Sequence, residues 1–266
     1  MTRFGNGVHP PTVAAAVVVI VGLVLAGCTR GADETGTSGA TPTPVPTTTA
    51  TAPGVTPTPD PVATSEPTPT PTPTPTAPVF TSRIALIDDA LAERMQPSWW
   101  PGCPVPLEDL RYVTVTYVDF DGVAQEGELV VHADVADGIV GAFARLYELG
   151  YPIRSMRLVD DFDADDDASM AADNTSAFNC RAITGGTGWS EHAYGRAIDV
   201  NPVENPYVRG SHVAPPAGAA FVDRTSAHGV ILADDEVVRA FAAAGWLWGG
   251  DWERPIDYQH FSTTGR

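Results

Sequence analysis

Residues 190–199 read Ser-Glu-His-Ala-Tyr-Gly-Arg-Ala-Ile-Asp, and the chain reads Asp-Tyr-Gln-His from Asp257 to His260. Together the two segments supply His192, Asp199 and His260, which are side chains of the kinds that bind zinc. Three protein ligands leave the fourth position of a tetrahedral site for water, which is typical of a catalytic zinc site. Asp257 is then a candidate general base for that water.

The spacing within the first segment requires a bend in the chain. Asp199 follows His192 by seven residues, which corresponds to about 10 Å along a helix and about 23 Å along a strand. Because neither regular structure brings the two side chains onto one ion, the chain must turn between them, and Gly195 permits a turn. Residues 196–200 then read as a short strand.

The second segment presents a similar problem. Residues three apart on a strand point to opposite faces of a sheet, and Asp257 and His260 are three apart. We therefore expect Asp257 to lie in the turn after Pro255, and His260 to lie on a short strand that follows.

Taken together, the two segments resemble the zinc D-alanyl-D-alanine carboxypeptidase/endopeptidase family, which includes VanY-like enzymes and phage endolysin peptidases. The family pattern is Ser-x-His-(x)6-Asp, followed later by a Gly/Trp-rich run and an acid three residues before a histidine. The matching residues are Ser190, His192 and Asp199 in the first element, and residues 245–252, Asp257 and His260 in the second. The resemblance covers roughly residues 98–263.

The resemblance implies Zn²⁺ held by His192, Asp199 and His260, with Asp257 as the general base. The alternative role for Asp257 is to orient His260 from the second shell of the metal. Many family members carry glutamate at this point, so the aspartate resembles the endolysin-type variant, with a shorter base. The family also implies an α+β fold, with helices packed to one side of a mainly antiparallel sheet, as in Hedgehog-type domains.

Two further residues are candidates for the site. Arg181 precedes a glycine-rich turn, and an arginine there could stabilise an oxyanion or bind a substrate carboxylate in a bidentate manner. The alternative is a surface salt bridge. Ser190 is expected either to hydrogen-bond substrate or to orient His192.

Hydrophobic periodicity and turn residues predict the elements of the folded part. We expect helices over residues 80–95, 135–149 (capped by Asp134) and 234–244, strands over 112–118, 128–131 and 153–159, and a long acidic loop over 160–180. Asp121-Gly122 marks a hairpin between the first two strands. Because the pattern contains no repeating βαβ units, it favours an α+β fold with a mainly antiparallel sheet.

The N-terminus carries a targeting signal. Residues 13–26 are an apolar run of 14 residues, too short to span a bilayer comfortably but long enough for a signal-peptide core, with Arg3 as its positive flank. Leu25-Ala26-Gly27-Cys28 resembles a bacterial lipoprotein signal, in which Cys28 becomes the lipidated first residue. The alternative is an ordinary secretory signal with an incidental cysteine.

These features predict three regions: a signal peptide (1–27), a lipidated cysteine with a disordered Thr/Pro-rich linker (28–78), and a zinc peptidase domain (79–266). The protein would be extracytoplasmic and lipid-anchored to the outer face of the cell membrane. The chain has no lysine, a bias typical of GC-rich genomes, which suggests an actinobacterial lipoprotein.

Cysteine use fits an oxidising compartment. With Cys28 lipidated, Cys103 and Cys180 remain as a pair, and we expect a disulfide that stabilises the fold by roughly 4 kcal/mol in the chain-entropy model. Two buried free thiols are the alternative.

The formal net charge of −18 argues against nucleic acid as a partner, because few cations are available to neutralise phosphates. The family resemblance implies a hydrolase that cleaves peptide bonds in peptidoglycan stem peptides, and we expect a monomer, with D-Ala-D-Ala carboxypeptidase action favoured. The acidic residues 160–167 would repel a terminal carboxylate if they lined the same end of the cleft. An endopeptidase of the same family and a non-catalytic, zinc-dependent cell-wall binding module are the alternatives.

Overall fold

The computed structural model describes residues 79–183 and 186–266. The chain divides into two units, Met1–Pro69 and Thr70–Arg266, and the described residues all belong to the second. The predicted signal peptide, Cys28 and the linker lie outside the described residues and stay predictions. Among the helices of the described residues, none is long and apolar enough to cross a membrane.

The fold is α+β, as predicted, and its largest sheet is antiparallel. The sheet has the order β1-β2-β3 and consists of Ser82–Leu86, Leu110–Val118 and Ala124–His132. A tight turn joins β2 to β3, in which Asp119 Oδ1 accepts hydrogen bonds from the backbone N–H groups of Asp121 and Val123. The predicted hairpin is therefore confirmed.

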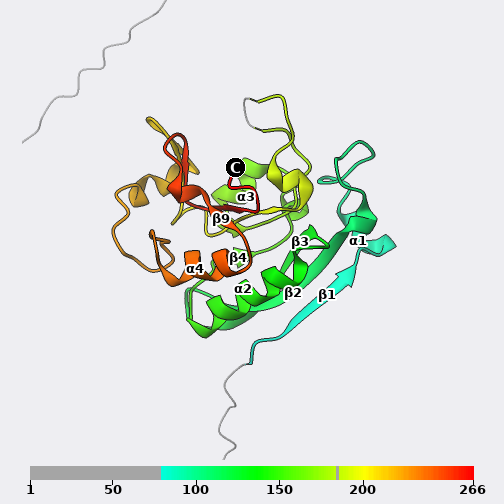
Figure 1. The fold of residues 1–266 in the computed structure, drawn as a ribbon, viewed down its shortest axis with the longest axis horizontal. Helices are drawn as coiled ribbons and strands as arrows, with labels where there is room; N and C mark the ends of the chain where they lie inside the picture. The colour runs from blue at the N-terminus through cyan, green and yellow to red at the C-terminus, as the bar shows by residue number, and fades with distance from the viewer. Residues whose placement is uncertain (1–78, 184–185) are drawn as a thin grey trace, which may run out of the picture. The chain divides into compact units, whose positions relative to one another are not determined.

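Helices cover one side of this sheet. Helix α2 (Ala136–Glu148) lies along β2 and β3, and α4 (Glu236–Ala243) packs beside α2 (Figure 1). The buried face of α2 carries Ile139 and Phe143 into the core. Phe241 of α4 meets Phe143 edge to face at a ring distance of 5.9 Å and stacks on Phe261 at 4.1 Å. Phe261 thus links the helical layer to the segment that carries the second motif.

Short strands build the rest of the described unit. One sheet has the order β6-β11-β9 and consists of Ala197–Asp199, His260–Ser262 and Leu247–Trp248. A second has the order β10-β7-β8 and consists of Ile256–Asp257, Tyr207–Arg209 and His212–Ala214. The parallel pair of β4 and β5 comprises Ser155–Met156 and Asn174–Thr175. The remaining helical segments are α1 (Asp89–Arg94), α3 (Asp166–Ala171), η1 (Leu107–Asp109), η2 (Val159–Phe162), η3 (Glu191–Tyr194), η4 (Pro216–Phe221) and η5 (Gly249–Asp251).

The predicted disulfide is present and lies at the edge of a second, smaller core. Cys103 and Cys180 are bonded across 77 residues of sequence. Met95, Leu110 and Phe178 are buried around them. The bond therefore ties the loop after α1 to the segment that leads into the first motif.

Two predictions about the elements before α2 are wrong. The helix over residues 80–95 is instead the edge strand β1 followed by the short α1, since Ile84 and Leu86 are exposed rather than turned to a core. β1 gains its backbone hydrogen bonds from β2. Asp134 does not cap α2, because its carboxylate accepts from Arg196 and contacts His132 instead.

The predictions for residues 153–180 and for the turn at Asp257 also need correction. The strand predicted over residues 153–159 is limited to β4, and the predicted acidic loop over residues 160–180 contains most of η2 together with α3 and β5. Asp165 starts α3 by accepting a hydrogen bond from the backbone N–H of Ala168, so acids that read as a loop in fact begin a helix. Asp257 belongs to β10, where it pairs with Tyr207, rather than to a turn.

Candidate metal centre

The structure brings His192, Asp199 and His260 together in a buried cluster. One ligand atom from each lies within 4.8 Å of the others. The Nε2 atom of His192 is 3.3 Å from Asp199 Oδ2 and 3.3 Å from His260 Nδ1, and His260 Nδ1 is 3.0 Å from Asp199 Oδ1. Two imidazole nitrogens and a carboxylate oxygen facing one point are a donor set that suits zinc.

Glycine makes the bend that the spacing of the first motif requires. Gly195 ends η3 with a φ of 64°, in the left-handed region, and the chain then enters β6. A Cβ atom at this position would lie 2.6 Å from the backbone nitrogen of His132. Only glycine therefore fits both the backbone conformation and the close approach to β3.

Backbone carbonyls select the tautomer of each imidazole. Nδ1 of His192 lies 2.6 Å from the carbonyl oxygen of Ala177, and Nε2 of His260 lies 3.2 Å from the carbonyl oxygen of Arg266. A carbonyl can only accept, so each of these nitrogens carries a hydrogen and donates it. The opposite nitrogen of each ring is then unprotonated and faces Asp199, which is how metal-binding histidines are usually oriented.

The carboxylate of Asp199 is kept ionised. Burial acts to raise its pKa, but the positive charges and hydrogen bonds that His192 and His260 supply when they are protonated outweigh burial and hold the pKa well below the ordinary range. Since metals bind the deprotonated carboxylate, the residues present fit a zinc ion.

Asp257 lies beside this cluster, and the pKa of its carboxyl group is raised whereas that of Asp199 is lowered. The Oδ1 atom of Asp257 is shielded from solvent and has no hydrogen-bond partner among the described residues. Burial and the nearby charge of Asp199 raise its pKa to about 7. A carboxyl group with such a pKa exchanges a proton readily near neutral pH, as a general base must.

A second glycine allows Asp257 and His260 to lie close to η5. A Cβ atom on Gly249 would lie 2.6 Å from the carbonyl oxygen of Asp257 and 3.2 Å from Cβ of His260. The indole of Trp252, the residue directly after η5, lies 5.4 Å from the His260 ring. The Gly/Trp-rich run before the second motif therefore forms a wall of the site.

Residues 184–263 match the model of a protein family described as D-alanyl-D-alanine carboxypeptidase. This segment is therefore similar to that family. It contains all three clustered ligands and Asp257, whereas Arg181 precedes it. No curated protein and no solved structure matches the chain in the comparisons with those two groups.

The guanidinium of Arg181 is already engaged in an ion pair. Its guanidinium Nη2 lies 2.8 Å from Asp166 Oδ2, and both side chains are 26% exposed. The Nε atom of Arg181 is buried without a hydrogen-bond partner among the described residues. The predicted arginine is thus a half-buried member of an ion pair with donor capacity to spare, and sequence reasoning missed its partner Asp166.

Ser190 has a local structural contact. Its Oγ accepts from the backbone N–H of His192 at 3.4 Å, and so caps the start of η3. Its own N–H donates to the carbonyl oxygen of Arg181 at 3.0 Å. These contacts favour the orienting role for Ser190, and they place the segment of Arg181 alongside the first motif.

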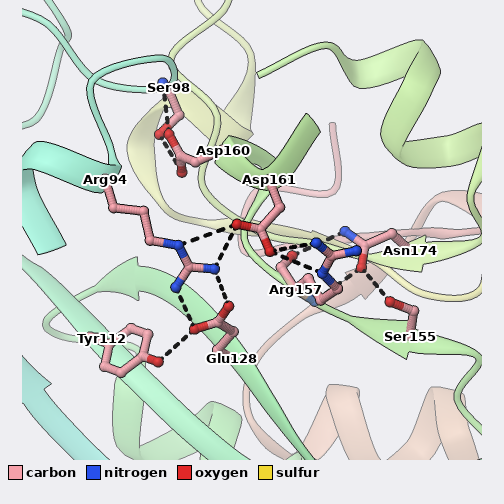
Figure 2. A network of polar contacts seen from close by, with 9 residues as sticks. All are labelled: Arg94, Ser98, Tyr112, Glu128, Ser155, Arg157, Asp160, Asp161 and Asn174. Atoms are coloured by element: carbon pink, nitrogen blue, oxygen red, sulfur yellow. Dashed lines mark hydrogen bonds and ion pairs between the residues drawn. The ribbon is translucent and has the colours of Figure 1, made fainter. Parts of the chain in front are cut away.

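A polar network holds the segment that supplies Asp166 (Figure 2). Arg94 of α1 is bonded to both Glu128 of β3 and Asp161 of η2, and Arg157 is bonded to Asp161 as well. The Oγ and backbone N–H of Ser98 both donate to Asp160 at 3.0 Å. η2 is therefore tied to the sheet and to α1, which fixes the start of the acidic segment.

Arg196 lies away from the cluster, as predicted, because its Nη2 pairs with Asp134 Oδ2 at 2.6 Å. Sequence reasoning missed a pocket of about 410 Å³ whose lining includes Trp252 and Arg266, which both contact His260. It is lined by Asp251, Trp252, Glu253, Arg254, Gly265 and Arg266. The charged run after the Gly/Trp-rich segment was the available signal for it.

Proposed function

We propose that the protein is an extracytoplasmic zinc peptidase that cleaves peptide bonds in peptidoglycan stem peptides, attached to the outer face of the cell membrane through lipidated Cys28. The observation that carries the enzymatic part is the position of Asp257. A carboxyl group whose Oδ1 has no hydrogen-bond partner among the described residues, and whose pKa is raised to about 7, lies next to three clustered side chains that could hold a metal.

Zinc held by His192, Asp199 and His260 would act as a Lewis acid toward the scissile carbonyl and would lower the pKa of water. The two backbone carbonyls behind the imidazoles keep the ligand nitrogens facing Asp199. Residues of the chain supply the remaining chemistry.

Asp257 accepts the proton of the attacking water and then gives it to the leaving amine. Its Oδ1 has no competing hydrogen-bond partner among the described residues, so the lone pairs are available. A pKa near neutrality lets one carboxyl group act first as a base and then as an acid in the same turnover.

Arg181 binds substrate in this proposal. Its guanidinium has five N–H donors, and one terminal nitrogen already pairs with Asp166. The remaining donors can bind the terminal carboxylate of a peptide that ends in D-Ala-D-Ala. Carboxypeptidase action is therefore the activity that we favour.

One observation favours endopeptidase action as the second candidate. The negative charge of Asp166 next to Arg181 reduces the local attraction for a free carboxylate. A substrate whose chain continues past the scissile bond has no such carboxylate to place there.

A digestion with two substrates tests both activities. The purified full chain, loaded with zinc, is incubated with a free pentapeptide that ends in D-Ala-D-Ala and with cross-linked muropeptide dimers. Loss of one alanine from the pentapeptide, abolished by a chelator and restored by zinc, is the expected result. Cleavage of the dimers alone would favour the endopeptidase, and no cleavage of either by zinc-loaded protein would contradict the proposal.

A further inference from the structure

Two tryptophans form an exposed aromatic pair that the proposed chemistry does not use. The rings of Trp100 and Trp189 lie 6.3 Å apart with an angle of 55° between their planes. Trp100 is 41% exposed and is the one aromatic residue among the large exposed apolar side chains of the described residues. Covering this exposed indole with a ligand would remove apolar surface from water and would therefore be favourable.

The backbone that carries the exposed ring is held in place by specific contacts. The backbone N–H of Trp100 donates to Cys103 Sγ at 3.3 Å, and Cys103 is bonded to Cys180. On the other side, Ser98 is fixed by its two hydrogen bonds to Asp160 (Figure 2). A loop whose backbone is already ordered loses less conformational freedom when a ligand binds on it.

The pair is continuous with the proposed substrate site. Trp189 forms an antiparallel bridge with Ala182, the residue after Arg181. Trp189 also precedes Ser190, which caps the helix that carries His192. The Trp189 side chain packs on the small core around the disulfide and also contacts Trp100. A group bound on these rings would therefore be attached to, or close to, the peptide being cut.

We propose that Trp100 and Trp189 form a subsite for a neutral sugar ring of the glycan strand that carries the stem peptide. Sugar rings present a face of C–H groups that stacks on the electron-rich face of an indole. A neutral sugar also suits a chain with a net charge of −18, which would repel an anionic polymer. This inference rests on the proposed function, because stem peptides are covalently linked to sugars in peptidoglycan, and it deepens that function by naming glycan-linked peptides as the preferred substrate.

Paired substrates test the subsite. The purified full chain and its Trp100→Ala, Trp100→Phe and Leu86→Ala variants are assayed on a disaccharide-pentapeptide and on the same pentapeptide without sugar. Leu86 is a matched control, because it is exposed and apolar but lies on the edge strand β1. Zinc content and melting temperature confirm that each variant is folded.

The expected result is a loss of roughly tenfold in kcat/KM for Trp100→Ala on the disaccharide-pentapeptide, the effect of removing a well-ordered aromatic contact. Activity on the free pentapeptide should be unchanged, Trp100→Phe should keep most of the preference, and Leu86→Ala should resemble the wild type. An equal loss on both substrates would show that Trp100 binds peptide instead and would overturn the proposal. An unchanged kcat/KM of Trp100→Ala on both substrates would also overturn the proposal.

A binding measurement separates this inference from the proposed function. Titration of the protein with a β-1,4-linked N-acetylglucosamine tetramer should change tryptophan fluorescence in the wild type and not in Trp100→Ala. If the wild type cleaves neither peptide, the proposed function fails while the titration still decides the sugar subsite. If the wild type cleaves the peptides but the sugar produces no Trp100-dependent change, the subsite is wrong and the peptidase stands.

Discussion

His260 lies directly opposite Asp199 in the antiparallel pairing of β11 with β6, and its Nδ1 is 3.0 Å from Asp199 Oδ1. The register of two short strands therefore sets the distance between two of the three metal-binding side chains. The third, His192, reaches the same point because η3 ends at Gly195 and returns the chain into β6. The metal centre thus depends on backbone geometry as much as on ligand identity.

Gly195→Ala should destabilise the protein and disturb the metal site together. The new Cβ would meet the backbone nitrogen of His132 at 2.6 Å, in addition to the strain of a φ of 64°. We expect a loss of about 1–3 kcal/mol in the free energy of unfolding and weaker zinc binding, measured by denaturant titration and metal analysis. Gly122→Ala is the matched control, since its φ is 77° but no atom lies within 4 Å of the added Cβ. Equal costs at both glycines would remove the argument from close approach.

Asp257→Asn should separate metal binding from catalysis. Asparagine keeps the shape of the side chain but cannot accept the proton of water, so zinc content should stay normal while kcat falls by roughly a hundredfold or more. Near-normal turnover would instead assign Asp257 the orienting role toward His260.

The pH profile offers a second measurement on the same residue. Burial and the charge of Asp199 raise the pKa of Asp257, and a base works only when it is ionised. Activity of the wild type should therefore fall as the pH drops through this pKa. In Asp257→Asn the residual activity should lose that acidic limb, and an unchanged limb would mean that another group titrates there.

The sequence predicted which side chains cluster at the site better than it predicted the backbone contacts that orient them. The clustering of His192, Asp199 and His260, the bend at Gly195 and the disulfide were expected from residue types, spacing and the family resemblance, and the structure contains all three. The carbonyl oxygens of Ala177 and Arg266 that orient the imidazoles belong to the backbone, and every residue type carries a carbonyl. No sequence pattern could single them out.

The errors in the predicted helices, strands and loops also arise from contacts that the local sequence does not reveal. Ile84 and Leu86 have helix-like spacing with their neighbours, yet they lie on an edge strand because pairing with β2 satisfies the backbone there. The sequence predicts that Asp166 lies in an acidic loop. Its ion pair with Arg181 is a tertiary contact, and the preceding η2 is held by the hydrogen bond between Arg94 and Asp161. Such tertiary contacts override local propensity.

Variants of Arg181 and Asp166 should distinguish the two candidate activities. If Arg181 binds a terminal carboxylate, Arg181→Ala should raise KM strongly for free-acid peptides and much less for their amidated forms. Asp166→Asn removes the competing charge 2.8 Å from the guanidinium and should lower KM for the free acids. Equal losses on both substrates in Arg181→Ala would point to oxyanion stabilisation and would leave carboxypeptidase action without its main support.

Removing the disulfide should cost stability and also disturb the Trp100 loop. The bond closes 77 residues of sequence, for which the chain-entropy model gives about 4 kcal/mol. The Cys103→Ser, Cys180→Ser double variant should show that loss in urea titrations while its zinc content at low denaturant stays normal. A stability within about 1 kcal/mol of the wild type would mean that the bond constrains little of the unfolded chain.

Metal stoichiometry in His260→Ala is the most direct test of the central claim that His192, Asp199 and His260 form one zinc site. The purified full chain is predicted to bind one zinc ion, and the variant is predicted to lose it and all chelator-sensitive peptidase activity. His212→Ala is the control, because His212 is exposed on β8 and outside the cluster, so it should keep both. Stoichiometric zinc with normal turnover in His260→Ala would contradict the account.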